Sequence, residues 1–221
     1  MTTVDLKPSD EFQFATGKGE VLLIACGALA REIVDLIERN RWAAFDLQCL
    51  PAKWHNTPQF IFPAVRQKIR EQRDRYKSIF VLYGDCGTGG LLDKMLEEEG
   101  VERIPGAHCY EFFAQPAAFA ALAEAEPGTF YLTDFLLRHF QRLVIEALGI
   151  DRHPELKDAY FGNYRRIVYL AQAPQPDSEA AARAVAARLG LEYRFQATGY
   201  GGLEKSLTAF AGRTQAIQWR A

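Results

Sequence analysis

The sequence predicts an α/β fold with a mainly parallel sheet and helices on both faces of that sheet. Two observations support this prediction. Short apolar runs alternate with segments of helical spacing along most of the chain, and glycine or proline separates many of them. Apolar runs without polar alternation are typical of strands that are buried on both faces. We therefore expect a Rossmann-like layered sandwich, built either as one domain or as two βα halves that share a cleft.

The expected domain layout begins with a polar lead-in at residues 1–20. A single α/β domain then covers residues 21–221, with a division into 21–126 and 127–221 as the alternative. In the first half, strands are expected at 21–25, 45–50, 79–84 and 101–104. Helices are expected at 28–39, 64–76, 91–99 and 110–124. Gly100 is a natural stop for the third helix, and Pro116 would interrupt the fourth.

The second half continues the strand and helix alternation with less regular connections. Strands are expected at 130–132, 166–172 and 191–196. Helices are expected from Thr133 or Asp134 to 148, at 178–189 and at 203–210. Residues 149–163 are expected to be irregular.

Composition excludes several classes of protein. Hydrophobic residues make up 48% of the 221 residues and charged residues 24%, which is typical of a globular protein. The net charge of −2 gives no electrostatic footprint for nucleic acid. No apolar run approaches the roughly 20 residues that span a bilayer, and no signal-peptide core is present, so we expect a cytoplasmic protein without a membrane partner. Four cysteines in such a chain are more consistent with thiols or metal ligands than with a disulfide scaffold.

Three of the four cysteines occupy equivalent positions. Cys26, Cys86 and Cys109 each follow an apolar run and precede a predicted helix. Because parallel strands end at the same edge of a sheet, the three thiols are expected at that edge. A helix N-terminus favours the thiolate, so lowered pKa values are expected there. Cys49 lies inside a strand and is expected to be a packing residue, a role that also remains an alternative for the other three.

Histidines could complete a metal site with these cysteines. His55 follows the second predicted strand and is the preferred fourth ligand, and His108, beside Cys109, is the second choice. Three thiolates and one imidazole suit tetrahedral zinc. Three cysteines alone could instead hold an iron–sulfur cluster with one open position.

A glycine-rich turn follows the strand that precedes Cys86. Backbone N–H groups of such a turn could hold a phosphate or carboxylate, although a plain tight turn is an equal alternative. The turn lacks both the Gly-Lys-Ser/Thr ending of a P-loop and the GxGxxG order of a dinucleotide fingerprint. The weak ligand-binding candidates are Gly27, Asp85, Gly87, Thr88, Gly89 and Gly90, and Asp85 is also a candidate general base or helix cap.

Several short motifs together resemble the domain of unknown function 1638 family. These motifs are Ala25-Cys26-Gly27, His55-Asn56-Thr57-Pro58, Tyr83-Gly84-Asp85-Cys86-Gly87, Ala107-His108-Cys109 and Glu126-Pro127-Gly128-Thr129-Phe130-Tyr131-Leu132-Thr133. The family has no settled activity. Its members occur with corrinoid-dependent methyl-transfer systems, which implies one-carbon metabolism, a corrinoid as substrate or partner cofactor, and a small molecule or corrinoid protein as partner. Many members carry an aspartate between the histidine and cysteine of the fourth motif, whereas His108 and Cys109 are adjacent here.

Three functional hypotheses follow. The first is a metal- or cluster-binding protein that uses Cys26, Cys86 and Cys109 and takes part in methyl transfer. The second is a metal-free enzyme with a cysteine nucleophile and His108 or His55 as base. The third is a non-catalytic protein that binds a small anionic ligand at the glycine-rich turns.

Overall fold

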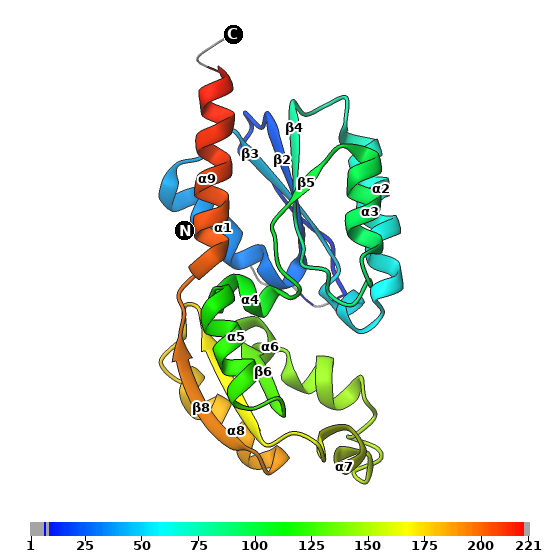
Figure 1. Cartoon of the computed structure of the whole chain (residues 1–221), viewed down its shortest axis with the longest axis vertical. Coiled ribbons are helices and arrows are strands. Elements are labelled where there is room, and N and C mark those ends of the chain that lie inside the picture. The colour runs from blue at the N-terminus through cyan, green and yellow to red at the C-terminus, as the bar shows by residue number, and fades with distance from the viewer. Residues whose placement is uncertain (1–6, 8, 219–221) are drawn as a thin grey trace. The chain divides into compact units, whose positions relative to one another are not determined.

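The chain folds into two compact units, each with its own sheet (Figure 1). The computed structural model describes residue 7 and residues 9–218. The first unit comprises residues 1–109 and 203–221, and the second comprises residues 110–202. The division between the units falls at 109/110, whereas the alternative to a single domain placed it at 126/127, and the last helix belongs to the first unit. Residues 1–6 and 8 of the expected lead-in lie outside the described residues.

The sheet of the first unit has five strands in the order β1-β3-β2-β4-β5. They are β1 (Phe12–Phe14), β2 (Val21–Cys26), β3 (Phe45–Leu50), β4 (Ser78–Leu82) and β5 (Glu102–Arg103). All neighbours are parallel except β1, which pairs antiparallel with β3. The sheet is therefore mixed, and residues 12–14 of the expected polar lead-in form an edge strand.

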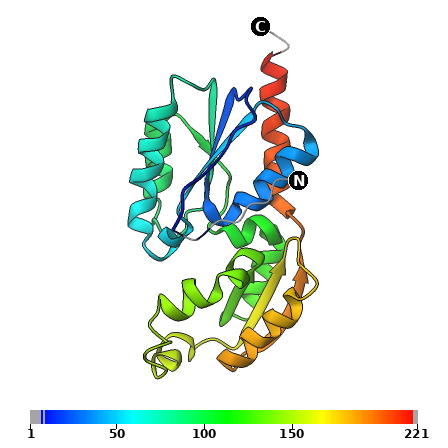
Figure 2. The ribbon, with the colours of Figure 1, turned by 180° about the vertical axis from the view of Figure 1, so that it is seen from behind.

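Helices cover both faces of this sheet (Figures 1 and 2). One face carries α1 (Ala30–Asn40) and α9 (Gly201–Gln218), and the other carries α2 (Ile61–Gln72) and α3 (Leu91–Glu99). On the first face, Phe210 of α9 stacks on Phe80 of β4 with ring centroids 4.2 Å apart. On the other face, Ile61 and Val65 of α2 pack into one buried cluster with Ile24. This double covering explains why the central strands are apolar without alternation.

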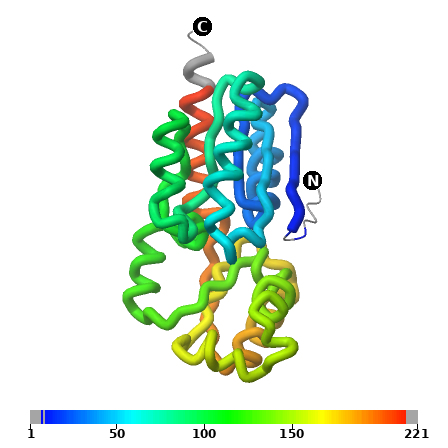
Figure 3. Tube along the Cα trace, turned by 90° about the vertical axis from the view of Figure 1, so that its right-hand side faces the viewer, coloured from blue at the N-terminus to red at the C-terminus, as the bar shows by residue number. Residues whose placement is uncertain are grey.

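Short helical turns follow the strands at the carboxyl edge of the sheet. They are the 3₁₀ turns η1 (Gly27–Leu29), η2 (Ala52–Asn56) and η3 (Pro58–Phe60). The trace in Figure 3 follows the chain by colour and shows α9, in red, beside the blue-to-green elements of the first unit. Ligands of parallel sheets bind at the carboxyl edge, so this edge is where a site is expected.

The second unit has three parallel strands in the order β6-β7-β8. These are β6 (Thr129–Thr133), β7 (Arg166–Ala171) and β8 (Glu192–Ala197). Its helices are α4 (Cys109–Ala114), α5 (Pro116–Ala125), α6 (Asp134–Arg138), the π-helical η4 (Gln141–Glu146), α7 (Leu156–Phe161) and α8 (Ser178–Leu189).

Two predictions for this unit were wrong. The helix expected to run to residue 148 ends at Arg138, and a separate π-helix follows at Gln141–Glu146. Residues 149–163, which were expected to be irregular, contain α7. The break at Pro116 is confirmed, because α4 ends at Ala114 and α5 begins at the proline. Within the described part of the chain, none of the helices has the length and apolar character needed to cross a membrane.

Candidate functional site

The candidate site begins with two neighbouring side chains at the carboxyl edge of the larger sheet. Strand register places Ala25 of β2 opposite Leu82 of β4, so the next residues, Cys26 and Tyr83, continue side by side. Both pack into the cluster that lies under α2 and α3. Cys86 joins this cluster from the turn after β4 and is only 8% exposed. The structure thus brings together two of the three predicted cysteines.

The backbone around Cys86 is held in an unusual conformation. Its φ of 48° lies in the left-handed region, which an L-residue rarely adopts without compensation. The N–H of Cys86 donates to the carbonyl oxygen of Ala107 at 2.9 Å, and that of Asp85 donates to Gly106 at 3.2 Å. Gly84 permits this approach, because a Cβ there would lie 3.1 Å from the backbone of Ala107. The turn after β4 is therefore joined to the loop after β5.

This junction also places Cys109 near Cys86. The backbone N–H of Cys109 hydrogen-bonds to the Cys86 sulfur, and so does the backbone of Gly84. The Cys109 side chain is partly exposed, at the first position of α4. The position of the third cysteine beside the second is thus set by main-chain contacts.

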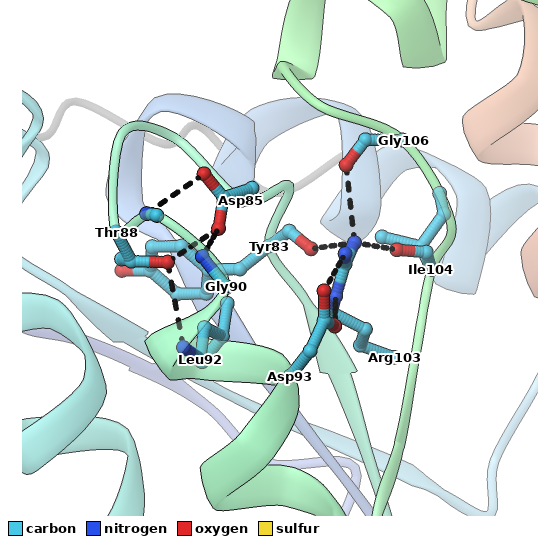
Figure 4. Close-up of polar contacts among 10 residues, drawn as sticks. Tyr83, Asp85, Thr88, Gly90, Leu92, Asp93, Arg103, Ile104 and Gly106 are labelled. Atoms are coloured by element: carbon cyan, nitrogen blue, oxygen red, sulfur yellow. Dashed lines mark hydrogen bonds and ion pairs between the residues drawn. The ribbon is translucent and has the colours of Figure 1, made fainter.

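Arg103 holds the junction from the β5 side (Figure 4). Its Nη1 donates to the carbonyl oxygens of Ile104 and Gly106 at 2.8 and 3.1 Å, and to that of Tyr83 at 3.4 Å. Its Nη2 donates to Asp93 Oδ2 of α3 at 2.8 Å. A planar guanidinium can reach several acceptors in fixed directions, so one side chain fixes both loops and α3.

The thiols of Cys26 and Cys86 have raised pKa values, so the expectation of lowered values was wrong for these two cysteines. Burial raises the pKa of Cys26 from 9.0 to about 12, and the neighbouring Cys86 adds to the shift. Burial likewise raises the pKa of Cys86, although the backbone of Cys109 and Gly84 opposes it. Desolvation of the thiolate raises its pKa more than the hydrogen bonds from these backbone N–H groups lower it.

Tyr83 is a buried hydroxyl among these sulfurs. Its side chain is 2% exposed, and its oxygen makes no hydrogen bond of standard geometry to any described residue. It interacts instead with the thiol of Cys26. Burial raises the pKa of the Tyr83 phenol well above its ordinary value, and the neighbouring Cys26, Cys49 and Cys86, once ionised, raise it further. A buried donor without a standard partner is uncommon and usually has a reason.

His108 lies close enough to His55 to influence the charge of the His55 imidazole. His55 is in η2 and His108 precedes α4, and both side chains are exposed. Protein atoms nevertheless surround His55, and this desolvation together with the charge of His108 lowers the pKa of His55. The two histidines that sequence reasoning proposed as alternatives for one ligand position are therefore neighbours.

Cys49 lies on the other face of the sheet. It pairs with Ala25 in register, one position before Cys26, so its side chain points away from the α2 and α3 face. It is 1% exposed, and the charge of Glu32 of α1 contributes to the raised pKa of its thiol. The expectation that Cys49 is a buried packing residue is confirmed.

The predicted ligands do not yet stand in a metal-binding arrangement. Among residue 7 and residues 9–218, no three His, Cys, Asp or Glu side chains are grouped so that they could hold a metal ion. The structure brings the predicted residues together in pairs: Cys26 with Cys86, Cys86 with the backbone of Cys109, and His55 with His108.

The glycine-rich turn binds a carboxylate of the chain itself. Asp85 accepts hydrogen bonds from Thr88 Oγ1 at 2.6 Å, from the N–H of Gly90 at 2.8 Å and from that of Gly89 at 3.1 Å (Figure 4). Burial raises the pKa of Asp85, but these hydrogen bonds and Arg103 outweigh it and leave the pKa below its ordinary value. Two of the N–H groups predicted to hold an anion therefore already have one.

The two remaining glycine candidates differ in their surroundings. Gly27 is buried at the start of η1, next to Cys26. Gly87 is exposed in the turn, where an added Cβ would lie 3.5 Å from Pro58 of η3. Gly87 therefore marks where the turn after β4 meets the segment that follows His55.

Sequence reasoning missed Tyr83 and Arg103. Tyr83 stands where the apolar run ends, and it is read most simply as one more core residue. Arg103 lies on a two-residue strand with no local pattern around it. Its role depends on three carbonyl groups and one carboxylate brought together by folding, so no local signal could have identified it.

Comparison with known proteins agrees with the resemblance seen in the motifs. The model of a family described as a protein of unknown function, DUF1638, matches residues 49–207, well over half of the chain. The chain belongs to the DUF1638 family. Four of the five predicted ligands lie within the matched residues, and Cys26 precedes them. No curated protein and no solved structure matches the chain.

Proposed function

We propose that the first unit of this DUF1638 protein binds a thiophilic metal, either a zinc ion or an iron–sulfur cluster, at the carboxyl edge of its sheet. Cys26, Cys86 and Cys109 are the proposed thiolate ligands. His55 is the preferred fourth ligand and His108 the alternative. Thiolate and imidazole are the donors that zinc and iron–sulfur clusters take in proteins, whereas magnesium and calcium take oxygen.

One observation carries the proposal. Cys26 and Cys86 come from positions 60 residues apart and meet as electrostatic neighbours at the same buried edge, with the backbone of Cys109 against Cys86. Cys109 and both histidines carry partly or fully exposed side chains, so rotation about their side-chain bonds is the movement that would complete a ligand set. The strained φ of Cys86, held by the joined loops, fixes the position of one ligand in advance.

The pKa directions favour a metal over a metal-free nucleophile. Thiols with raised pKa values are protonated at neutral pH, and a protonated thiol is a poor nucleophile. A bound cation reverses this, because a coordinated thiol loses its proton. Metal binding at this edge would therefore release protons, which is itself measurable.

Tyr83 gives the proposal a supporting group. Its buried hydroxyl lacks a standard partner and interacts with the Cys26 thiol. A thiolate that is held by a metal accepts hydrogen bonds better than a neutral thiol does, so the hydroxyl would then be satisfied. Such outer-shell donors orient and tune the ligands that they contact.

Anion binding at the glycine-rich turn is less well supported. The carboxylate of Asp85 accepts the N–H groups of Gly89 and Gly90 and would repel a second anion. Rossmann-like layering, cytoplasmic location and a role in corrinoid-linked one-carbon transfer, with a small molecule or a corrinoid protein as partner, remain predictions from the motifs and the resemblance.

The test is metal analysis of the full chain, purified anaerobically without an affinity metal. We expect stoichiometric zinc, or iron with acid-labile sulfide. After removal of the metal, titration with Zn²⁺ against a chromophoric competitor should give an affinity that Cys86→Ser lowers by more than ~100-fold, and proton release should accompany binding. Tyr83→Phe should lower the affinity by about 10-fold.

Cys49→Ser is the matched control, since it removes a thiol of the same unit from the opposite face. It should leave the affinity within about 3-fold of the native value, the spread expected for a change outside the ligand shell. Protein that holds no metal after anaerobic purification and takes up none in titration would overturn the proposal. Equal losses in Cys86→Ser and Cys49→Ser would also overturn it, because both would then act through stability alone.

A further inference from the structure

The edge strand β8 of the second unit is unusually open. It pairs with β7 on one side, and no other described strand pairs with it on the other side. Five of its six residues are exposed, including Phe195, whose side chain is 44% exposed. An edge strand of this length presents unpaired backbone groups as a template for another strand.

The direction of these backbone groups follows from the pairing with β7. The N–H of Glu192 donates to Arg165 and that of Thr198 donates to Ala171, both toward β7. Because the direction alternates along a strand, the N–H and C=O groups of Tyr193, Phe195 and Ala197 point away from β7. These odd-numbered residues are the ones that a new neighbour would bind.

Side chains alternate between the two faces in the same way. Tyr193 and Phe195 lie on the face of Tyr169, and the Phe195 ring contacts the Tyr169 ring edge-on with centroids 5.9 Å apart. Glu192 and Arg194 lie on the opposite face, exposed, and neither makes an ion pair with another described residue. The two charges of β8 are therefore opposite in sign and two positions apart on one face.

We propose that β8 is the interface of a homodimer, in which β8 of a second copy pairs antiparallel with it about a two-fold axis through Tyr193. This arrangement places Glu192 opposite Arg194 of the second copy, and the symmetry repeats the pair. It places Phe195 opposite Leu191 of the second copy, which covers the exposed ring. The two three-stranded sheets become one sheet of six strands, a common size.

Charge selects this register among those that the backbone allows. Hydrogen bonding requires odd-numbered residues to face odd-numbered residues, so the two-fold axis passes through Tyr193, Arg194 or Phe195. An axis through Arg194 opposes two guanidinium groups, which is unfavourable. An axis through Phe195 places Arg194 opposite Gln196 and leaves both charges without a counterpart. The axis through Tyr193 pairs every charge of the strand.

The test is charge exchange, measured by sedimentation equilibrium of the full chain over about 1–100 µM, a range that brackets micromolar dimers. The native chain should reach the dimer mass within this range. Arg194→Glu opposes two carboxylate pairs, and Glu192→Arg opposes two guanidinium pairs. Each single variant should raise the dimer dissociation constant by about 10- to 100-fold. The double variant Glu192→Arg with Arg194→Glu restores both ion pairs and should restore the dimer.

Controls separate the interface from folding and from net charge. Arg152→Glu makes the same charge change as Arg194→Glu, but on an exposed side chain in the loop before α7. It should not alter the dimer dissociation constant. All variants should keep the native circular dichroism, because both β8 charges are exposed. A native chain that stays monomeric up to the highest concentration overturns the proposal. Single variants that dimerise normally, or a double variant that does not recover, also overturn it.

Discussion

The parallel strands of the two sheets carry polar groups at equivalent carboxyl ends, but these groups differ in how fully they are hydrogen-bonded. In the second unit, Asp134 follows β6 and is buried, and both of its carboxylate oxygens are used. Oδ1 accepts from the hydroxyl of Tyr169 at 2.6 Å, and Oδ2 accepts from the N–H of Ala173 at 2.7 Å. The backbone N–H of Asp134 donates to Gln172, which donates in turn to the carbonyl of Leu170. The polar groups at this edge therefore already have hydrogen-bond partners within the unit.

The edge of the first unit leaves its polar groups less satisfied. The Tyr83 hydroxyl makes no standard hydrogen bond to a described residue, and the thiols of Cys26 and Cys86 are protonated and desolvated. Soft side chains with little hydrogen-bonding demand tolerate burial better than a carboxylate does. The comparison indicates that topology places polar residues at both edges, whereas side-chain chemistry decides which edge remains available to a ligand.

The largest effect should come from removing the carboxylate of the second edge. Asp134→Ala leaves the buried Tyr169 hydroxyl and the Ala173 N–H without acceptors, so we expect a loss of about 4 kcal/mol in the free energy of unfolding. Asp134→Asn keeps one acceptor oxygen and should lose about half as much. Urea unfolding monitored by circular dichroism measures both. A loss below about 1 kcal/mol for the alanine variant would show that this edge is not held by its hydrogen bonds.

Arg103 should give the largest effect in the first unit. Arg103→Ala removes the donors to Ile104 and Gly106 and the ion pair with Asp93, so we expect a loss of about 3 kcal/mol. Arg103→Lys should recover only a part, since one ammonium cannot reach all of these acceptors. Lys77→Ala, which breaks an exposed pair with Glu20, is the control and should cost no more than about 0.5 kcal/mol. Equal losses for Arg103→Ala and Lys77→Ala would contradict the role given to Arg103.

Two tyrosine variants compare the edges directly. Tyr169→Phe removes a hydrogen bond to a buried carboxylate and should cost about 2 kcal/mol. Tyr83→Phe removes a hydroxyl without a standard partner and should change the free energy of unfolding of metal-free protein by less than about 0.5 kcal/mol, or stabilise it. Denaturant midpoints at equal m-values give both numbers. A large loss in the metal-free Tyr83→Phe variant would remove the contrast between the two edges.

The smallest effect is the pH dependence that comes from Cys26. Its pKa rises on folding from 9.0 to about 12, so its contribution to stability is complete below pH 9.0 and is lost as the pH rises toward 12. The native chain should therefore lose about 1 kcal/mol more than Cys26→Ala between about pH 8 and pH 10, in metal-free protein. Urea unfolding at both pH values measures the difference. Equal losses of unfolding free energy in the native chain and in Cys26→Ala would contradict the burial of a neutral Cys26 thiol.

Sequence patterns located most of the fold but not its exceptions. The strands β2, β3 and β7 and the helices α3 and α8 lie within two residues of their predicted ranges, because these three strands are buried on both faces and glycine ends both helices. β1 was missed because an edge strand with one covered side has only a weak apolar signal. α7 was missed because a six-residue helix between turns carries too few periodic positions to be recognised.

The sequence by itself predicted that three cysteines and two histidines follow strands at the carboxyl edge of a mainly parallel sheet, because strand direction follows from connectivity. Only the tertiary structure decided which of these side chains meet and how burial changes their pKa values. The meeting of Cys26 with Tyr83 depends on strand register, and the position of Cys109 depends on the loops that Gly84 and Arg103 hold together. The raised thiol pKa values depend on burial, which sums over the whole unit and cannot be read from any single stretch of sequence.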